Sequence, residues 1–215
     1  MENRQEPYQI LLSEGSGEII EKKSRFIATL RPVASEEEAN IFIEEMKKKY
    51  WDARHNCSAF VIGSRGELTR CSDDGEPSGT AGRPMLETLI GSGIKNVCVV
   101  VTRYFGGVLL GTGGLVRAYT QAVKEGLTAC ETATMRYGME YLATMEYTEV
   151  GKVQYLLAKP EIVMQDTQYA ENVTMQFFVP YEMAAKLEKD ITEGTAGRVK
   201  LELLEKKYLQ VKDAR

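Results

Sequence analysis

Five glycines lie between two arginines in the stretch TRYFGGVLLGTGGLVRAY, Thr102 to Tyr119. The arginines are Arg103 and Arg117, and the glycines are Gly106, Gly107, Gly111, Gly113 and Gly114. Glycine lets a ligand approach the backbone closely, and a guanidinium group can donate two hydrogen bonds to one phosphate. The rings of Tyr104 and Phe105 could stack on a base. The composition therefore suits an anionic ligand, such as a nucleotide or an RNA phosphate, and a tight structural turn is the alternative.

The established phosphate-binding motifs do not match this stretch. A Walker A loop needs the tripeptide Gly-Lys-Ser/Thr, which occurs nowhere in the chain. The dinucleotide fingerprint needs a third glycine three residues after the second, and Val116 stands there instead. The stretch opens a helix after a buried strand, so unpaired N–H groups at the helix start are the remaining anion-binding feature.

A second candidate is the acid-rich loop DDGEPSGTAGRP, which contributes Asp73, Asp74 and Glu76. Three carboxylates within four positions could hold Mg²⁺, which prefers oxygen ligands. They could equally form ion pairs with the arginines, or the segment could be a solvated turn in which Thr80 caps the next helix. We expect the two arginines and this loop to converge on one solvent-accessible cleft.

His55 is the only histidine, and it precedes a strand in the segment ARHNCSAF. Structural zinc requires four ligands at recognisable spacings, which are absent here. A nucleophilic pair with Cys57 would need an accessible thiolate, and no GxSxG serine motif exists. We therefore predict His55 as a hydrogen-bonding wall of the cleft, with no catalytic residue, no metal site and no cofactor.

The totals restrict the class of protein. The chain has 215 residues, is 43% hydrophobic and carries a net charge of -4. Proteins that coat nucleic acid non-specifically are usually basic, so any nucleic-acid contact must be local. The four cysteines form no CxxC pair and no secretory signal opens the chain, which predicts reduced thiols in the cytoplasm. No apolar run is long enough for a membrane helix.

The periodicity predicts an N-terminal domain over residues 1–134. Its expected strands are residues 8–12 and 17–33, which a turn at EGSG separates, followed by residues 57–63, 66–72 and 97–103. Expected helices follow a capping box at Ser35 and Glu38, begin near Pro84, and cover 115–130. In the last helix Arg117, Gln121 and Lys124 lie off the apolar stripe. We interpret this order as a two-layer α/β domain.

Residues 135–215 predict a second domain. Strands are expected at 137–147, 161–169, 173–179 and 198–211, with helices at 150–157 and 180–191. The order β-α-β-β-α-β is that of a ferredoxin-like unit, and the fold class of the whole chain is α+β.

Two long segments carry a family resemblance: RCSDDGEPSGTAGRP and VVVTRYFGGVLLGTGGLVRAY, in that order, after ARHNCSAF. Together they resemble the paired motifs of the IMPACT/YigZ family, and the two-domain layout is similar to that of its bacterial members. The resemblance implies an N-terminal domain like the second domain of ribosomal protein S5 and a C-terminal domain like domain V of elongation factor G.

The resemblance also suggests a role in translation. Eukaryotic relatives restrain the amino-acid-starvation response through a ribosome-associated protein, but we expect no counterpart here of the extra interaction domain that they carry. A proline-dipeptidase label attached to some relatives has no support in these residues, because no two-metal ligand set is visible.

The predicted function is thus a nucleic-acid- or ribosome-binding module in translation control, and the expected partner is RNA, the ribosome or a protein of that process. The alternatives are a Mg²⁺-dependent enzyme or binder of a small phosphorylated ligand, and a protein-interaction scaffold. The predicted cleft comprises His55, Asp73, Asp74, Glu76, Arg103, Tyr104, Phe105, Gly106, Gly107, Gly111, Gly113, Gly114 and Arg117.

Overall fold

The computed structural model describes residues 6–211 and has the predicted α+β fold. Tyr8–Thr132 form one compact unit, and residues 133–211 form the other together with Glu6 and Pro7. This division falls two residues before the expected domain boundary.

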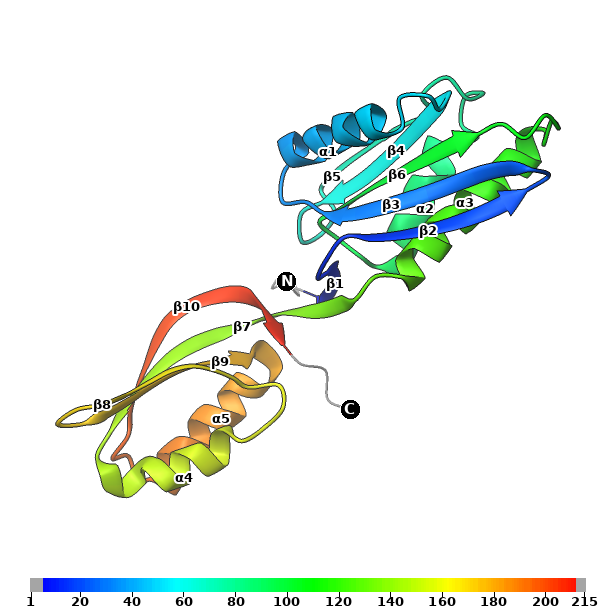
Figure 1. Cartoon of the computed structure of the whole chain (residues 1–215). Helices are drawn as coiled ribbons and strands as arrows, with labels where there is room; N and C mark the ends of the chain where they lie inside the picture. Colours follow the sequence, from blue (N-terminus) through cyan, green and yellow to red (C-terminus); the bar gives the residue numbers. More distant parts are fainter. Residues whose placement is uncertain (1–5, 212–215) are drawn as a thin grey trace. The chain divides into compact units, whose positions relative to one another are not determined.

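The first unit is built on a mixed sequence of strands and helices. Its strands are β1 (Tyr8–Leu11), β2 (Gly15–Glu21), β3 (Ser24–Pro32), β4 (His55–Ile62), β5 (Leu68–Ser72) and β6 (Val97–Tyr104), and its helices are α1 (Glu36–Lys49), α2 (Gly82–Ser92) and α3 (Thr112–Thr128). Five strands form an antiparallel sheet in the order β2-β3-β6-β4-β5 (Figure 1). In strand β1, Gln9 forms an isolated parallel β-bridge with Ile94.

Helices cover both faces of this sheet. Val97, Val99 and Val101 of β6 pack into the core formed with α2 and α3. Cys98 and Val100, on the opposite face of the same strand, pack against α1. The unbroken apolar run of β6 is typical of a strand covered on both sides. The domain therefore has three layers where the element order predicted two.

The start of α1 follows the predicted capping box. The Ser35 hydroxyl accepts a hydrogen bond from the Glu38 N–H at 3.2 Å, and the Glu38 carboxylate accepts one from the Ala34 N–H at 2.7 Å. The side chains thus satisfy the N–H of Glu38 in the first turn and the N–H of Ala34, which lies one residue before the N-cap Ser35.

The expected long strand over 17–33 is a hairpin, and the expected turn at EGSG lies largely inside β2. The chain reverses at Lys22 and Lys23, between the paired residues Glu21 and Ser24. Gly17 explains the wrong turn prediction, because a β-carbon there would lie 2.5 Å from the Gly126 nitrogen. This glycine is required where β2 packs directly on α3, and it marks no turn.

The second unit has the predicted ferredoxin-like order. It consists of β7 (Thr132–Met145), α4 (Tyr147–Leu157), β8 (Val163–Tyr169), β9 (Val173–Pro180), α5 (Tyr181–Gly194) and β10 (Lys200–Val211). The strand order is β10-β7-β9-β8, with antiparallel neighbours. Val153 and Leu157 of α4 and Leu187 of α5 share one core with the sheet. None of the helices within residues 6–211 is long and apolar enough to cross a membrane.

Candidate functional site

The acid-rich loop between β5 and α2 is held in place by its first carboxylate. Asp73 accepts hydrogen bonds from the N–H groups of Gly79 at 2.8 Å, Ala81 at 3.0 Å and Gly82 at 2.9 Å. Burial would raise the pKa of Asp73, but these three donors outweigh it and hold the pKa below its ordinary value. Asp73 thus satisfies the start of α2, the role predicted for Thr80, whose hydroxyl instead donates to the Pro77 carbonyl at 2.6 Å.

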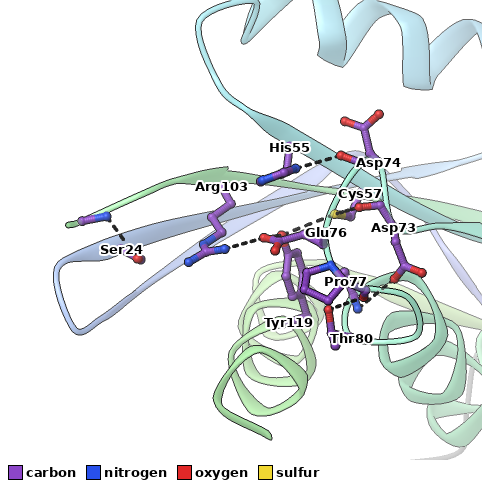
Figure 2. Close-up of polar contacts among 12 residues, drawn as sticks. Ser24, His55, Cys57, Asp73, Asp74, Glu76, Pro77, Thr80, Arg103 and Tyr119 are labelled. Atoms are coloured by element: carbon purple, nitrogen blue, oxygen red, sulfur yellow. Dashed lines mark hydrogen bonds and ion pairs between the residues drawn. The ribbon is translucent and has the colours of Figure 1, made fainter. Parts of the chain in front are cut away.

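The third carboxylate of the loop forms a buried ion pair with the strand β6. The Glu76 Oε1 atom lies 2.6 Å from Nη1 of Arg103, and the two side chains are only 3% and 8% exposed (Figure 2). Of the alternatives for this loop, the ion pair with an arginine is the one that the structure contains. The pair ties residues 27 positions apart and fixes the loop against the sheet.

Tyr119 of α3 joins this pair from the helix layer. Its hydroxyl donates to the Glu76 Oε1 atom at 2.9 Å and lies 3.3 Å from the Cys57 sulfur (Figure 2). Burial, followed by the neighbouring Cys57 and Glu76, raises the pKa of Tyr119 far above its usual value. The four side chains of Cys57, Glu76, Arg103 and Tyr119, which we call the buried cluster, link β4, the loop, β6 and α3.

His55 and Asp74 lie beside the buried cluster and fix the other side of the loop. The His55 Nδ1 atom donates to the Asp74 carbonyl at 2.8 Å, because a carbonyl oxygen can only accept. The Asp74 carboxylate accepts the N–H of Asn56 at 2.7 Å. Asp74 adopts a φ of 40°, in the left-handed region. His55 is therefore a hydrogen-bonding residue of this loop attachment.

Arg103 is closed off from solvent by aromatic rings. Its guanidinium carbon lies 5.4 Å from the centre of the Phe26 ring and 5.6 Å from that of Phe105. The Phe105 ring is half-exposed and covers the arginine, and Tyr104 donates its hydroxyl to Asp52 at 2.8 Å. The expectation that Arg103 lines an open cleft is wrong, because its charge is already paired in the core.

These contacts count against two alternatives raised by the sequence, a Mg²⁺ site in the acid-rich loop and a cysteine nucleophile at Cys57. Asp73 uses both carboxylate oxygens on backbone N–H groups, and the Oε1 atom of Glu76 is bound by Arg103 and Tyr119, so Mg²⁺ would have to displace these contacts. No group of three or more histidines, cysteines and acids in residues 6–211 is placed to hold a metal ion. Burial raises the pKa of the Cys57 thiol far above its usual value, which removes the thiolate that a nucleophile requires.

The glycines of the second motif serve the path of the backbone. A β-carbon on Gly106 would lie 2.0 Å from the carbonyl carbon of Lys23, so this glycine permits direct contact with the β2–β3 turn. Gly107 and Gly111 have φ values of 82° and 74°, which disfavour any other residue. Gly114 packs against Leu110, whereas a side chain on Gly113 would meet open space.

Arg117 lies in a different place from Arg103. It lines an open groove of about 600 Å³ between α3 and the β2–β3 hairpin, which we call the α3 groove. Its walls include Glu21, Lys22, Leu110, Arg117, Gln121 and Lys124. Neither Arg103 nor any residue of the acid-rich loop lines it. The predicted convergence of both arginines on one cleft is therefore wrong.

The cations of the α3 groove are free of ion pairs. Among the described arginines, all except Arg54 and Arg117 pair with a carboxylate. The lysines that form ion pairs within residues 6–211 do not include Lys22 or Lys124. Glu21 is the only acidic side chain that lines the groove. The groove is thus a local basic surface on an acidic protein.

Sequence reasoning missed several residues of both regions. The helical period puts Tyr119 on the apolar face of α3, although a buried tyrosine hydroxyl usually needs a partner. The sequence suggested only His55 as a partner of Cys57, and nothing in it placed the Phe26 ring beside Arg103. The sequence gives no sign that Lys22 lies in a turn, because residues 17–33 read as one continuous strand.

The chain matches two domain families. The Impact N-terminal domain covers residues 22–127, and the domain of unknown function DUF1949 covers residues 144–198. The chain is 40% identical to the IMPACT family member YvyE of Bacillus subtilis over 203 residues, which is 94% of each chain. It is 37% identical to the IMPACT family member YigZ of Escherichia coli, covering 86% of this chain and 91% of the relative.

More distant and structural similarities agree with this assignment. Human protein IMPACT is 36% identical over 98 residues, which is 43% of this chain and 30% of the relative. A solved structure described as the crystal structure of an hypothetical protein is 35% identical, with a TM-score of 0.59. The similarity covers 93% of this chain and 98% of that one.

Proposed function

Because this chain belongs to the IMPACT family, we propose that it is an RNA-binding module of translation, and that the α3 groove holds the RNA backbone. The RNA is a free strand or one exposed on the ribosome. The expected resemblance of the two domains to those of ribosomal protein S5 and elongation factor G supports a partner of this kind.

The observation that carries the proposal is the unpaired set of cations in the α3 groove. Lys22, Arg117 and Lys124 face one groove and have no carboxylate partner among the described residues. Unpaired lysine and arginine side chains contact phosphates and release counterions, which is the main source of affinity for a nucleic-acid backbone. The overall charge of -4 leaves such contacts local.

The spacing along α3 fits a chain of phosphates. Arg117, Gln121 and Lys124 follow one another at four and three residues, so they lie on one face of the helix. Seven residues of helix separate Arg117 from Lys124 by about 10 Å along the axis. This face therefore presents two positive charges along a line, and Gln121 between them donates its amide N–H to Glu125 at 2.7 Å.

The test is the salt dependence of RNA binding, measured by fluorescence anisotropy with a labelled single-stranded oligoribonucleotide. Three phosphate contacts predict that the logarithm of the association constant falls with a slope of about -2 against the logarithm of salt concentration. The Arg117→Ala/Lys124→Ala variant should lose most of that slope. Arg54→Ala is the matched control, because Arg54 is also exposed and unpaired but does not line the groove.

Two outcomes would contradict the proposal. Equal affinity and slope in the wild type and the double variant would remove the groove as the site. Full competition by a mononucleotide with Mg²⁺, at concentrations where the oligonucleotide is saturating, would favour the small-ligand alternative instead.

A further inference from the structure

The turn between β2 and β3 has an unusual composition for its geometry. Glu21 and Ser24 pair across the hairpin, which leaves a two-residue loop of Lys22 and Lys23. Their φ values are 46° and 67°, both in the left-handed region. A two-residue loop with positive φ at both positions strongly favours Asn-Gly, because a β-carbon is strained there. This chain places two lysines at the strained positions.

The turn is held rigidly against the glycine-rich loop. The Gly106 N–H donates to the Ser24 hydroxyl at 3.1 Å (Figure 2). The Gly106 backbone also lies directly on the carbonyl of Lys23, where no β-carbon would fit. The hairpin tip therefore cannot relax its backbone without displacing the loop that leads into α3.

Both lysine side chains are exposed, and neither forms an ion pair with a described carboxylate. Lys22 lines the α3 groove on the wall opposite Arg117 and Lys124. Strained residues of this kind cluster at functional sites and persist where the surrounding structure holds them. The same backbone would be more stable with glycine.

We propose that the Lys22–Lys23 turn is a second phosphate-binding element, kept at the expense of stability. It holds a polynucleotide backbone from the hairpin side while α3 holds it from the other, so that a chain of several phosphates is preferred over a mononucleotide. The inference rests on the proposed function, in which Lys22 is already a phosphate contact, and adds Lys23, which lies outside the groove lining.

Three turn variants of the full chain separate strain from charge. Lys22→Asn/Lys23→Gly removes both the strain and the charge. It should raise the melting temperature by about 4 °C and make the salt slope of RNA binding shallower by about 1.4. Lys22→Gln/Lys23→Gln keeps the strain and removes the charge, so only the slope should fall. Lys22→Arg/Lys23→Arg keeps both and should leave the melting temperature and the slope at wild-type values.

The readouts also separate this inference from the proposed function. If Arg117→Ala/Lys124→Ala loses affinity but both uncharged turn variants bind as the wild type does, the turn is not a binding element and the groove remains one. A melting temperature for Lys22→Asn/Lys23→Gly at or below that of the wild type would contradict the claim that the two lysines strain the turn. No salt-dependent affinity in the wild type overturns the proposed function, and this inference with it.

Discussion

The buried cluster and the α3 groove each contain one arginine of the same short motif, and the two arginines have opposite environments. Arg103 is paired with Glu76, covered by aromatic rings and almost inaccessible. Arg117 is exposed, unpaired and beside other free cations. A motif that looks like one binding site in sequence therefore contains two parts. One part attaches a loop to the fold, and the other is available to a ligand.

The largest expected effect is the loss of one partner of the buried ion pair. Glu76→Ala leaves the Arg103 charge uncompensated in the core, which should lower the free energy of unfolding by about 3–5 kcal/mol. Chemical denaturation measures this directly. The control is Glu87→Ala, which breaks the exposed pair with Arg83 and should cost less than about 1 kcal/mol. Equal losses in the two variants would contradict a structural role for the buried cluster.

The glycine-rich loop allows a smaller, matched comparison. Gly106→Ala forces a β-carbon onto the Lys23 carbonyl and should destabilise the protein by about 2 kcal/mol, in the range of overpacking. Gly113→Ala places its methyl group in open space within α3, where alanine favours helix by about 0.5 kcal/mol. Opposite signs of the two changes in denaturation would support close packing as the reason for Gly106. Similar changes would contradict it.

The loop attachment through Asp73 should depend on pH. Its folded pKa is lowered below 3.8 by three backbone donors, so its contribution is fully present above the unfolded pKa. That contribution is lost as the pH falls through the folded value. Asp73→Asn should therefore cost about 1 kcal/mol at pH 7, and the difference from the wild type should shrink below pH 4. A difference that is constant between pH 7 and pH 3 would contradict the assignment.

Much of the fold could be predicted because local patterns and packing agree. The capping box at Ser35, the apolar stripe of α3 and the alternation of β7 all correspond to elements of the structure. The sequence did not predict the hairpin at Lys22, because the turn contains neither glycine nor asparagine and the loop around Gly106 imposes its backbone conformation. The third layer was missed because element order does not specify which face of the sheet α1 covers.

The candidate site could be predicted only in part, since residue type does not reveal which charges pair across the fold. An ion pair between the acid-rich loop and an arginine was among the alternatives, but the sequence could not distinguish Arg103 from Arg117. Arg103 lies at the end of a buried strand and Arg117 lies off the apolar stripe of its helix. Only the arrangement of Glu76 and Tyr119 around one of them decides the difference.

The most direct test compares RNA affinity in two variants at one salt concentration. Arg103→Met/Glu76→Leu replaces the buried pair with apolar side chains of similar size, a change that is often tolerated, and costs the Tyr119 hydroxyl its acceptor. Arg117→Ala removes one exposed cation and should change the free energy of unfolding by no more than about 0.5 kcal/mol. We expect the first variant, once shown to be folded by circular dichroism, to bind as the wild type does, and the second to bind more weakly. Wild-type affinity in Arg117→Ala, together with loss of binding in the folded Arg103→Met/Glu76→Leu protein, would contradict the division of the motif into a structural and a binding part.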